Sequence, residues 1–134
     1  MNKFDGIIFD IDGTLTETNE LIYATFNHVL EKHLNIIYTE KQITELFGPT
    51  AEVIIRDLIK TNPEVAIEDY FGFYKANHNR MAKAYDGIAD IVRGIKEQGT
   101  PLSIYTGKGR RSSMITLKEF GLLDYFDMVV TGDD

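Results

Sequence analysis

Hydrophobic residues follow two different periods along this chain, and the period changes twice. Ile7, Ile8 and Phe9 form a short continuous apolar run, which predicts a strand buried on both faces. From about residue 18 the apolar residues recur every three to four positions, as expected for amphipathic helices. After about residue 84, helix-like and strand-like segments alternate. This order predicts an α/β sheet that is interrupted after its first strand by a helical insert.

Start and stop signals divide the insert into several helices. Thr39 and Gln42 have the spacing of a capping box, and we expect the helix that they begin to close at Gly48 and Pro49. The other expected helix starts are Thr18 or Asn19, Thr50, and Asn62 followed by Pro63. Residues 17–83 are therefore predicted to form an all-helical domain.

The remaining segments are predicted to form the sheet and its crossover helices. Residues 88–95 and 112–120 have helical spacing, and residues 101–106 and 127–131 are typical of short strands. Strands that alternate with helices pair in parallel through right-handed crossovers. The sequence thus predicts a Rossmann-like parallel sheet built from residues 1–16 and 84–134.

Composition narrows the classes of function. The chain has 134 residues, 43% of them hydrophobic, so it is expected to fold around a core. A net charge of -7 argues against non-specific nucleic-acid binding, and the lack of cysteine excludes disulfides and thiol chemistry. The sequence has no apolar run long enough for a membrane span, and Asp5 and Asp10 interrupt any signal-peptide pattern. A cytoplasmic protein without membrane partners is the expectation.

The chemistry is expected at the end of the first strand. Asp10 and Asp12 follow the apolar run, and their spacing in an extended segment points both carboxylates the same way. Gly13 then permits a sharp turn. Two carboxylates beside an apolar core need a cation or hydrogen-bond donors, and a hard divalent metal such as magnesium suits them. A helix cap or a simple turn is the alternative role for these acids.

The run Asp10-x-Asp12-Gly-Thr-Leu-Thr resembles the first motif of the haloacid dehalogenase superfamily of phosphotransferases. The resemblance extends over the whole chain and is closest to relatives such as phosphoglycolate phosphatase and β-phosphoglucomutase. It implies a Rossmann-like core with a helical cap inserted after the first strand. It also implies that Asp10 is the nucleophile and that Asp12 is the general acid and base. The Asp10 carboxylate and the Asp12 backbone carbonyl are implied to hold Mg²⁺.

A second match lies at the end of the second core strand. Thr106 and Gly107 resemble the family motif in which a hydroxyl and a backbone N–H bind phosphate, and a loop before a helix suits an anion. Lys108 follows and is a further candidate, although the family's catalytic lysine normally lies elsewhere. Arg110 and Arg111 are interpreted as a solvated helix start. The predicted substrate-binding residues are Gly13, Thr14, Thr106, Gly107 and Lys108.

The family's third and fourth motifs, a lysine and a later acidic cluster, have no counterpart before Asp134. We therefore expect a truncated form of a longer phosphatase, with little or no turnover of its own. Without later strands, the strand at residues 7–9 would expose an apolar edge. Self-association through that open edge is the corresponding prediction.

The leading functional hypothesis is a magnesium-dependent phosphatase of small phosphorylated metabolites that works through an aspartyl-phosphate. The substrate is open among phosphoglycolate, sugar phosphates, nucleotides and pyrophosphate. A phosphomutase of the same superfamily is an alternative, because it shares the acid pair. A receiver-like module or a non-catalytic phosphate-binding module is another, although a receiver carries its phosphoacceptor on a middle strand.

Overall fold

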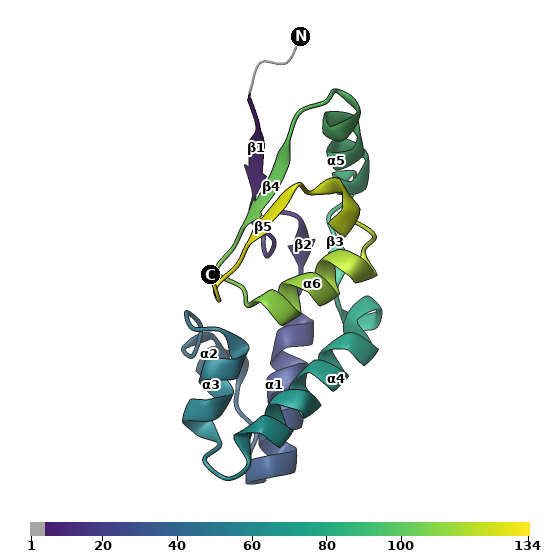
Figure 1. The fold of residues 1–134 in the computed structure, drawn as a ribbon. Coiled ribbons are helices and arrows are strands. Elements are labelled where there is room, and N and C mark those ends of the chain that lie inside the picture. Colours follow the sequence, from purple (N-terminus) through teal and green to yellow (C-terminus); the bar gives the residue numbers. More distant parts are fainter. Residues whose placement is uncertain (1–4) are drawn as a thin grey trace. The chain divides into compact units, whose positions relative to one another are not determined.

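The computed structural model of this chain describes residues 5–134. The chain folds into two compact units (Figure 1). A core unit contains the residues up to Glu17 together with Lys83–Asp134, and a helical unit contains Thr18–Ala82.

The core unit is built on a parallel sheet of three strands. β1 (Ile7–Phe9), β4 (Leu102–Tyr105) and β5 (Met128–Val130) lie in the order β1-β4-β5. Phe9 is paired with Ile104, and Tyr105 with Val130, so the carboxyl ends of all three strands lie at one edge of the sheet. The predicted α/β class with a parallel sheet is confirmed.

One face of this sheet carries the hydrophobic core. Helices α5 (Ile88–Glu97) and α6 (Arg110–Glu119) and the short helix η1 (Leu123–Tyr125) supply residues to it. Apolar side chains from the turn after β1 complete the cluster. Its fully buried members are Ile11, Leu15, Val92, Leu102, Ile104, Leu117 and Leu122.

The opposite face of the sheet is open within residues 5–134. Ile8, Tyr105 and Met128 are 70%, 67% and 60% exposed, one on each strand. The expectation that β1 is buried on both faces is therefore wrong for the part of the chain described. Successive residues of a strand point to opposite faces, so Ile7 and Phe9 pack on the core while Ile8 points away from it.

A two-stranded antiparallel ladder lies at the boundary of the core unit, where the chain passes to the helical unit after Glu17 and returns at Lys83. β2 (Thr16–Glu17) pairs with β3 (Lys83–Ala84), and the Tyr85 N–H donates to the Leu15 carbonyl at 3.0 Å. The sequence gives no strand signal at these two-residue segments, and the ladder was not predicted. It joins two distant parts of the chain, since its paired residues Thr16 and Ala84 are 68 positions apart.

The helical unit contains α1 (Asn19–Leu34), α2 (Glu40–Thr44), α3 (Ala51–Leu58) and α4 (Pro63–Met81). The two long helices, α1 and α4, pack along an aromatic seam in which the rings of Phe26 and Tyr70 meet edge to face at 4.9 Å. Near the end of α1, His33 Nε2 lies 2.7 Å and Lys32 Nζ 3.1 Å from Asp69 Oδ2 on α4. No helix within residues 5–134 combines the length and the apolar character needed to cross a bilayer.

The helix starts follow the predicted signals to different degrees. The capping box is confirmed, because Gln42 N–H donates to the Thr39 hydroxyl while the Gln42 side chain accepts from Thr39 N–H. The helix that it begins ends at Thr44, earlier than expected, and turns carry the chain on to Phe47. The predicted capping residues of α1, α3 and α4 occupy their positions without a side-chain cap bond; they are Thr18, Thr50 and Asn62.

Candidate active site

The acid pair lies at the carboxyl end of β1. Asp10 is exposed, and its Oδ1 accepts a 2.7 Å hydrogen bond from the Ile11 N–H. The side chain of Asp12 is 35% exposed. Between them, Ile11 is fully buried in the core. The core contact of Ile11 fixes the backbone between two acids that remain accessible to solvent.

A tight turn follows the pair and gives the segment its shape. Gly13 has a φ of 81°, a conformation that costs an L side chain more than glycine. Its N–H donates to the Thr16 carbonyl at 2.8 Å, and the N–H groups of Thr14 and Leu15 donate to the Ile11 carbonyl. Gly13 and Thr14 are exposed, whereas Leu15 is buried. The turn thus places two predicted substrate-binding residues on the surface next to Asp12.

The loop after β4 contains the second group of predicted residues. Thr106 is nearly buried, and its N–H donates to the Val130 carbonyl at 3.0 Å. Its hydroxyl accepts from the Lys108 N–H at 3.1 Å, and the Lys108 carbonyl accepts from the Gly132 N–H at 2.8 Å. The loop is therefore held to the end of β5 on both sides of the exposed Gly107.

Lys108 joins the two groups of residues. Its Nζ lies 3.2 Å from Oδ2 and 3.5 Å from Oδ1 of Asp12, a residue 96 positions away in the sequence. The Lys108 side chain is only 7% exposed. Burying an ammonium is costly unless it is paired, and the Asp12 carboxylate provides the pairing. The motif after β4 predicts a phosphate contact for Lys108, but this ion pair was not predicted, because its two residues are 96 positions apart.

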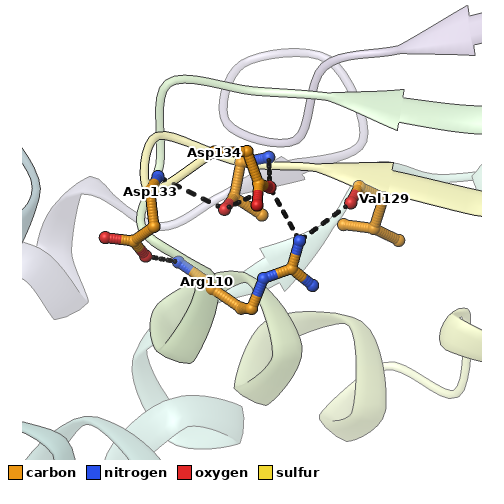
Figure 2. A network of polar contacts seen from close by, with 5 residues as sticks. Arg110, Val129, Asp133 and Asp134 are labelled. Atoms are coloured by element: carbon orange, nitrogen blue, oxygen red, sulfur yellow. Dashed lines mark hydrogen bonds and ion pairs between the residues drawn. The ribbon is translucent and has the colours of Figure 1, made fainter.

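Figure 2 shows a further network, which joins Arg110 at the start of α6 to Val129, Asp133 and Asp134. The Arg110 N–H at the start of α6 donates to Asp133 at 2.7 Å, and its guanidinium bonds the Asp134 carboxylate and the Val129 carbonyl. The interpretation of Arg110 as merely solvated is therefore wrong. Hydrogen bonds from the Thr131 N–H, from Arg110 and from the Thr131 hydroxyl lower the pKa of Asp134. The network fixes the segment after β5 against the start of α6.

The acid pair offers oxygen ligands that fit magnesium. Residues 5–134 contain no cluster of three or more histidine or acidic side chains that could hold a metal by themselves. Magnesium usually binds one or two carboxylates and completes its shell with waters and substrate phosphates. The exposed Asp10 carboxylate and the backbone carbonyl of Asp12 are oxygen ligands that match that donor set. They would hold the ion only together with ligands from outside this group.

The chain is similar to known proteins over nearly its whole length. The pyrophosphatase PpaX of Halalkalibacterium halodurans is 36% identical over 132 residues, which cover 98% of this chain and 61% of that protein. A crystal structure of a predicted phosphatase from Clostridium acetobutylicum is 30% identical with a TM-score of 0.69, and the match covers 96% of this chain and 61% of that one. The chain thus spans about three-fifths of the length of these relatives.

A third similarity concerns the fold alone. The crystal structure of a predicted phosphoglycolate phosphatase from Haemophilus somnus has a TM-score of 0.78 at 21% identity, over 98% of this chain and 64% of that one.

The sequence profile of the haloacid dehalogenase-like hydrolases matches residues 7–134, which include both strand ends of the candidate site. The resemblance found in the Asp10–Thr16 motif is therefore confirmed, and the chain belongs to the haloacid dehalogenase-like hydrolase family.

Proposed function

We propose that this protein is a phosphatase of small phosphorylated metabolites that works through an aspartyl-phosphate on Asp10. The observation that carries the proposal is the meeting of Asp12 and Lys108 beside the exposed Asp10, at the carboxyl ends of parallel strands. Ligand sites of parallel α/β sheets lie at this edge. Membership of a hydrolase family and similarity to a pyrophosphatase support the same reaction class.

The proposed reaction has two displacements at phosphorus. An Asp10 carboxylate oxygen bonds to phosphorus while the bond to the leaving oxygen breaks, and the Asp12 carboxyl gives that oxygen its proton. A water then attacks phosphorus and gives a proton to the Asp12 carboxylate. At the same time the bond from phosphorus to the Asp10 oxygen breaks. Orthophosphate is released and both acids return to their starting states.

The remaining candidate residues have supporting roles in this proposal. The exposed turn at Gly13 and Thr14 and the loop from Thr106 to Lys108 would bind phosphate oxygens. The Asp10 carboxylate and the Asp12 backbone carbonyl would hold Mg²⁺, which would reduce the repulsion between a carboxylate and a phosphate dianion. The helical unit, Thr18–Ala82, is proposed to act as the cap.

The test is direct detection of the phosphorylated residue. The protein is incubated with Mg²⁺ and acetyl phosphate, reduced with borohydride, and mapped by mass spectrometry, since reduction of an aspartyl-phosphate gives homoserine. Homoserine is expected at Asp10. Asp10→Asn should abolish the modification, whereas Asp124→Asn, which changes an exposed aspartate of η1, should leave it intact.

The same samples are assayed for orthophosphate release from pyrophosphate and phosphoglycolate, with Mg²⁺ and with EDTA. Formation of the phosphoenzyme does not require rapid turnover, so the mapping tests the nucleophile separately from the rate. Labelling at another residue, or equal labelling of wild type and Asp10→Asn, would overturn the proposal.

A further inference from the structure

Lys108 differs from the other residues of this site because its side chain is buried and because its backbone N–H, its carbonyl and its ammonium all have partners. Its backbone N–H donates to Thr106 at the end of β4, and its carbonyl accepts from Gly132 after β5. Its side chain crosses to Asp12 at the end of β1 and is only 7% exposed. The residue therefore connects three strand ends and has little freedom to leave the site.

The ion pair with Asp12 would put the Lys108 ammonium close to the leaving group of a substrate. Under the proposed function, Asp12 protonates the leaving oxygen and must come within hydrogen-bonding distance of it. Lys108 Nζ lies 3.2 and 3.5 Å from the two Asp12 oxygens. With a second hydrogen bond of about 3 Å between Asp12 and the leaving oxygen, the ammonium lies within roughly 6 Å of that oxygen. A charged oxygen two or three bonds from the leaving oxygen could therefore come within reach of the ammonium.

We propose that Lys108 selects substrates whose leaving group carries a negatively charged oxygen two or three bonds from the leaving oxygen. This inference rests on the proposed function and specifies its substrate class. Diphosphates and phosphorylated 2-hydroxy acids belong to that class, whereas phosphate esters of neutral alcohols do not. An ammonium has three N–H donors, so it can bond Asp12 and an anionic oxygen of the leaving group together.

The physical reason is the burial of the charge. An ammonium shielded from water interacts more strongly with an approaching anion than an exposed one does, because less solvent screens the pair. A charge-assisted hydrogen bond of this kind changes affinity by about tenfold or more. A neutral alcohol offers the ammonium no comparable partner. The preference should therefore depend on Lys108 and on the second charge of the ligand.

The experiment measures binding and does not depend on turnover. Methylenediphosphonate carries a second anionic group next to the bridging atom, and methylphosphonate lacks it. Their dissociation constants, with Mg²⁺ present, are measured by calorimetry for wild type, Lys108→Met and Lys118→Met. Lys118 is the matched control, because it is an exposed lysine in the last turn of α6.

Wild type is expected to bind the diphosphonate more tightly than methylphosphonate. In Lys108→Met the ratio of the two dissociation constants should fall by about tenfold or more, and in Lys118→Met it should stay unchanged. An unchanged ratio in Lys108→Met, or an equal loss for both ligands, would overturn the inference. If Lys108→Met does not fold, Lys108→Arg replaces it and should retain the preference, because the charge is kept; a loss of preference there would contradict the inference.

A second measurement uses wild type alone and does not depend on the folding of Lys108→Met. The lysine Nζ signal of Lys108 in nitrogen-15 spectra of wild type should shift with methylenediphosphonate and much less with methylphosphonate. Equal shifts would count against the inference. If Asp10 is phosphorylated but the preference for methylenediphosphonate does not depend on Lys108, this inference alone is refuted. Absence of the phosphoenzyme, with no effect of Asp10→Asn on ligand binding, would instead refute the proposed function.

Discussion

Two isoleucines on neighbouring strands test whether one face of the sheet is open in solution. Ile104 on β4 is fully buried, and Ile8 on β1 is 70% exposed. An Ile→Ala change removes three carbons, worth about 0.8 kcal/mol each when buried, or about 2.4 kcal/mol in transfer free energy. The cavity left at Ile104 brings the expected cost to about 2–5 kcal/mol.

The same arithmetic gives a much smaller effect at Ile8. About 30% of its surface is covered, so Ile8→Ala should cost about 0.7 kcal/mol in transfer free energy. Alanine also has a lower strand propensity than isoleucine, but that penalty applies to both variants and does not remove the difference.

Urea denaturation followed by circular dichroism measures both free energies of unfolding. If Ile104→Ala does not fold, Ile104→Val replaces it, with an expected cost of about 1 kcal/mol. Equal losses for the two alanine variants would refute the reasoning, because Ile8 would then have to be covered. Light scattering at the same protein concentration shows whether a second copy covers it, and Ile8→Lys should then give monomers.

Two further predictions concern the helical unit. Asp69→Asn should lower the free energy of unfolding by about 1 kcal/mol at pH 7, because the carboxylate loses its contacts with His33 and Lys32. The hydrogen bond from His33 lowers the pKa of Asp69. The difference in free energy of unfolding between wild type and Asp69→Asn should therefore be fully present above the usual carboxyl pKa and should disappear as the pH falls through the lowered pKa. Denaturation over a pH series measures this difference, and a difference that grows on acidification would contradict the prediction. Thr39→Ala should cost about 1 kcal/mol in urea denaturation, because it removes the acceptor for the Gln42 N–H at the start of a short helix. A loss no larger than the error of the measurement would show that the capping box does not stabilise the unit.

Much of the fold could be predicted from the sequence because its signals are local. The capping box at Thr39, the proline at the start of α4 and the apolar spacing of α1 each depend on residues a few positions apart. The acid pair was recognisable for the same reason, since its two carboxylates and the following glycine form one continuous motif. Helix ends were predicted less accurately, as the early end of α2 at Thr44 shows.

The features that sequence analysis missed depend on residues that are far apart in the chain. The β2–β3 ladder joins two segments of two residues, too short for any periodic signal. The exposure of Ile8 depends on which elements pack on each face of the sheet, and its isoleucine neighbour Ile7 has the same composition signal but contacts the core.

The order and type of the main elements and the acid pair at Asp10 and Asp12 could be predicted from residues close together in the chain, because they follow from short-range spacing and backbone preference. The contact of Lys108 with Asp12 and that of Arg110 with the segment after β5 could be found only in the folded molecule. Those contacts arise because parallel pairing brings the ends of separate strands to one edge of the sheet. The charge environment of the candidate site is a property of that edge and of no single segment.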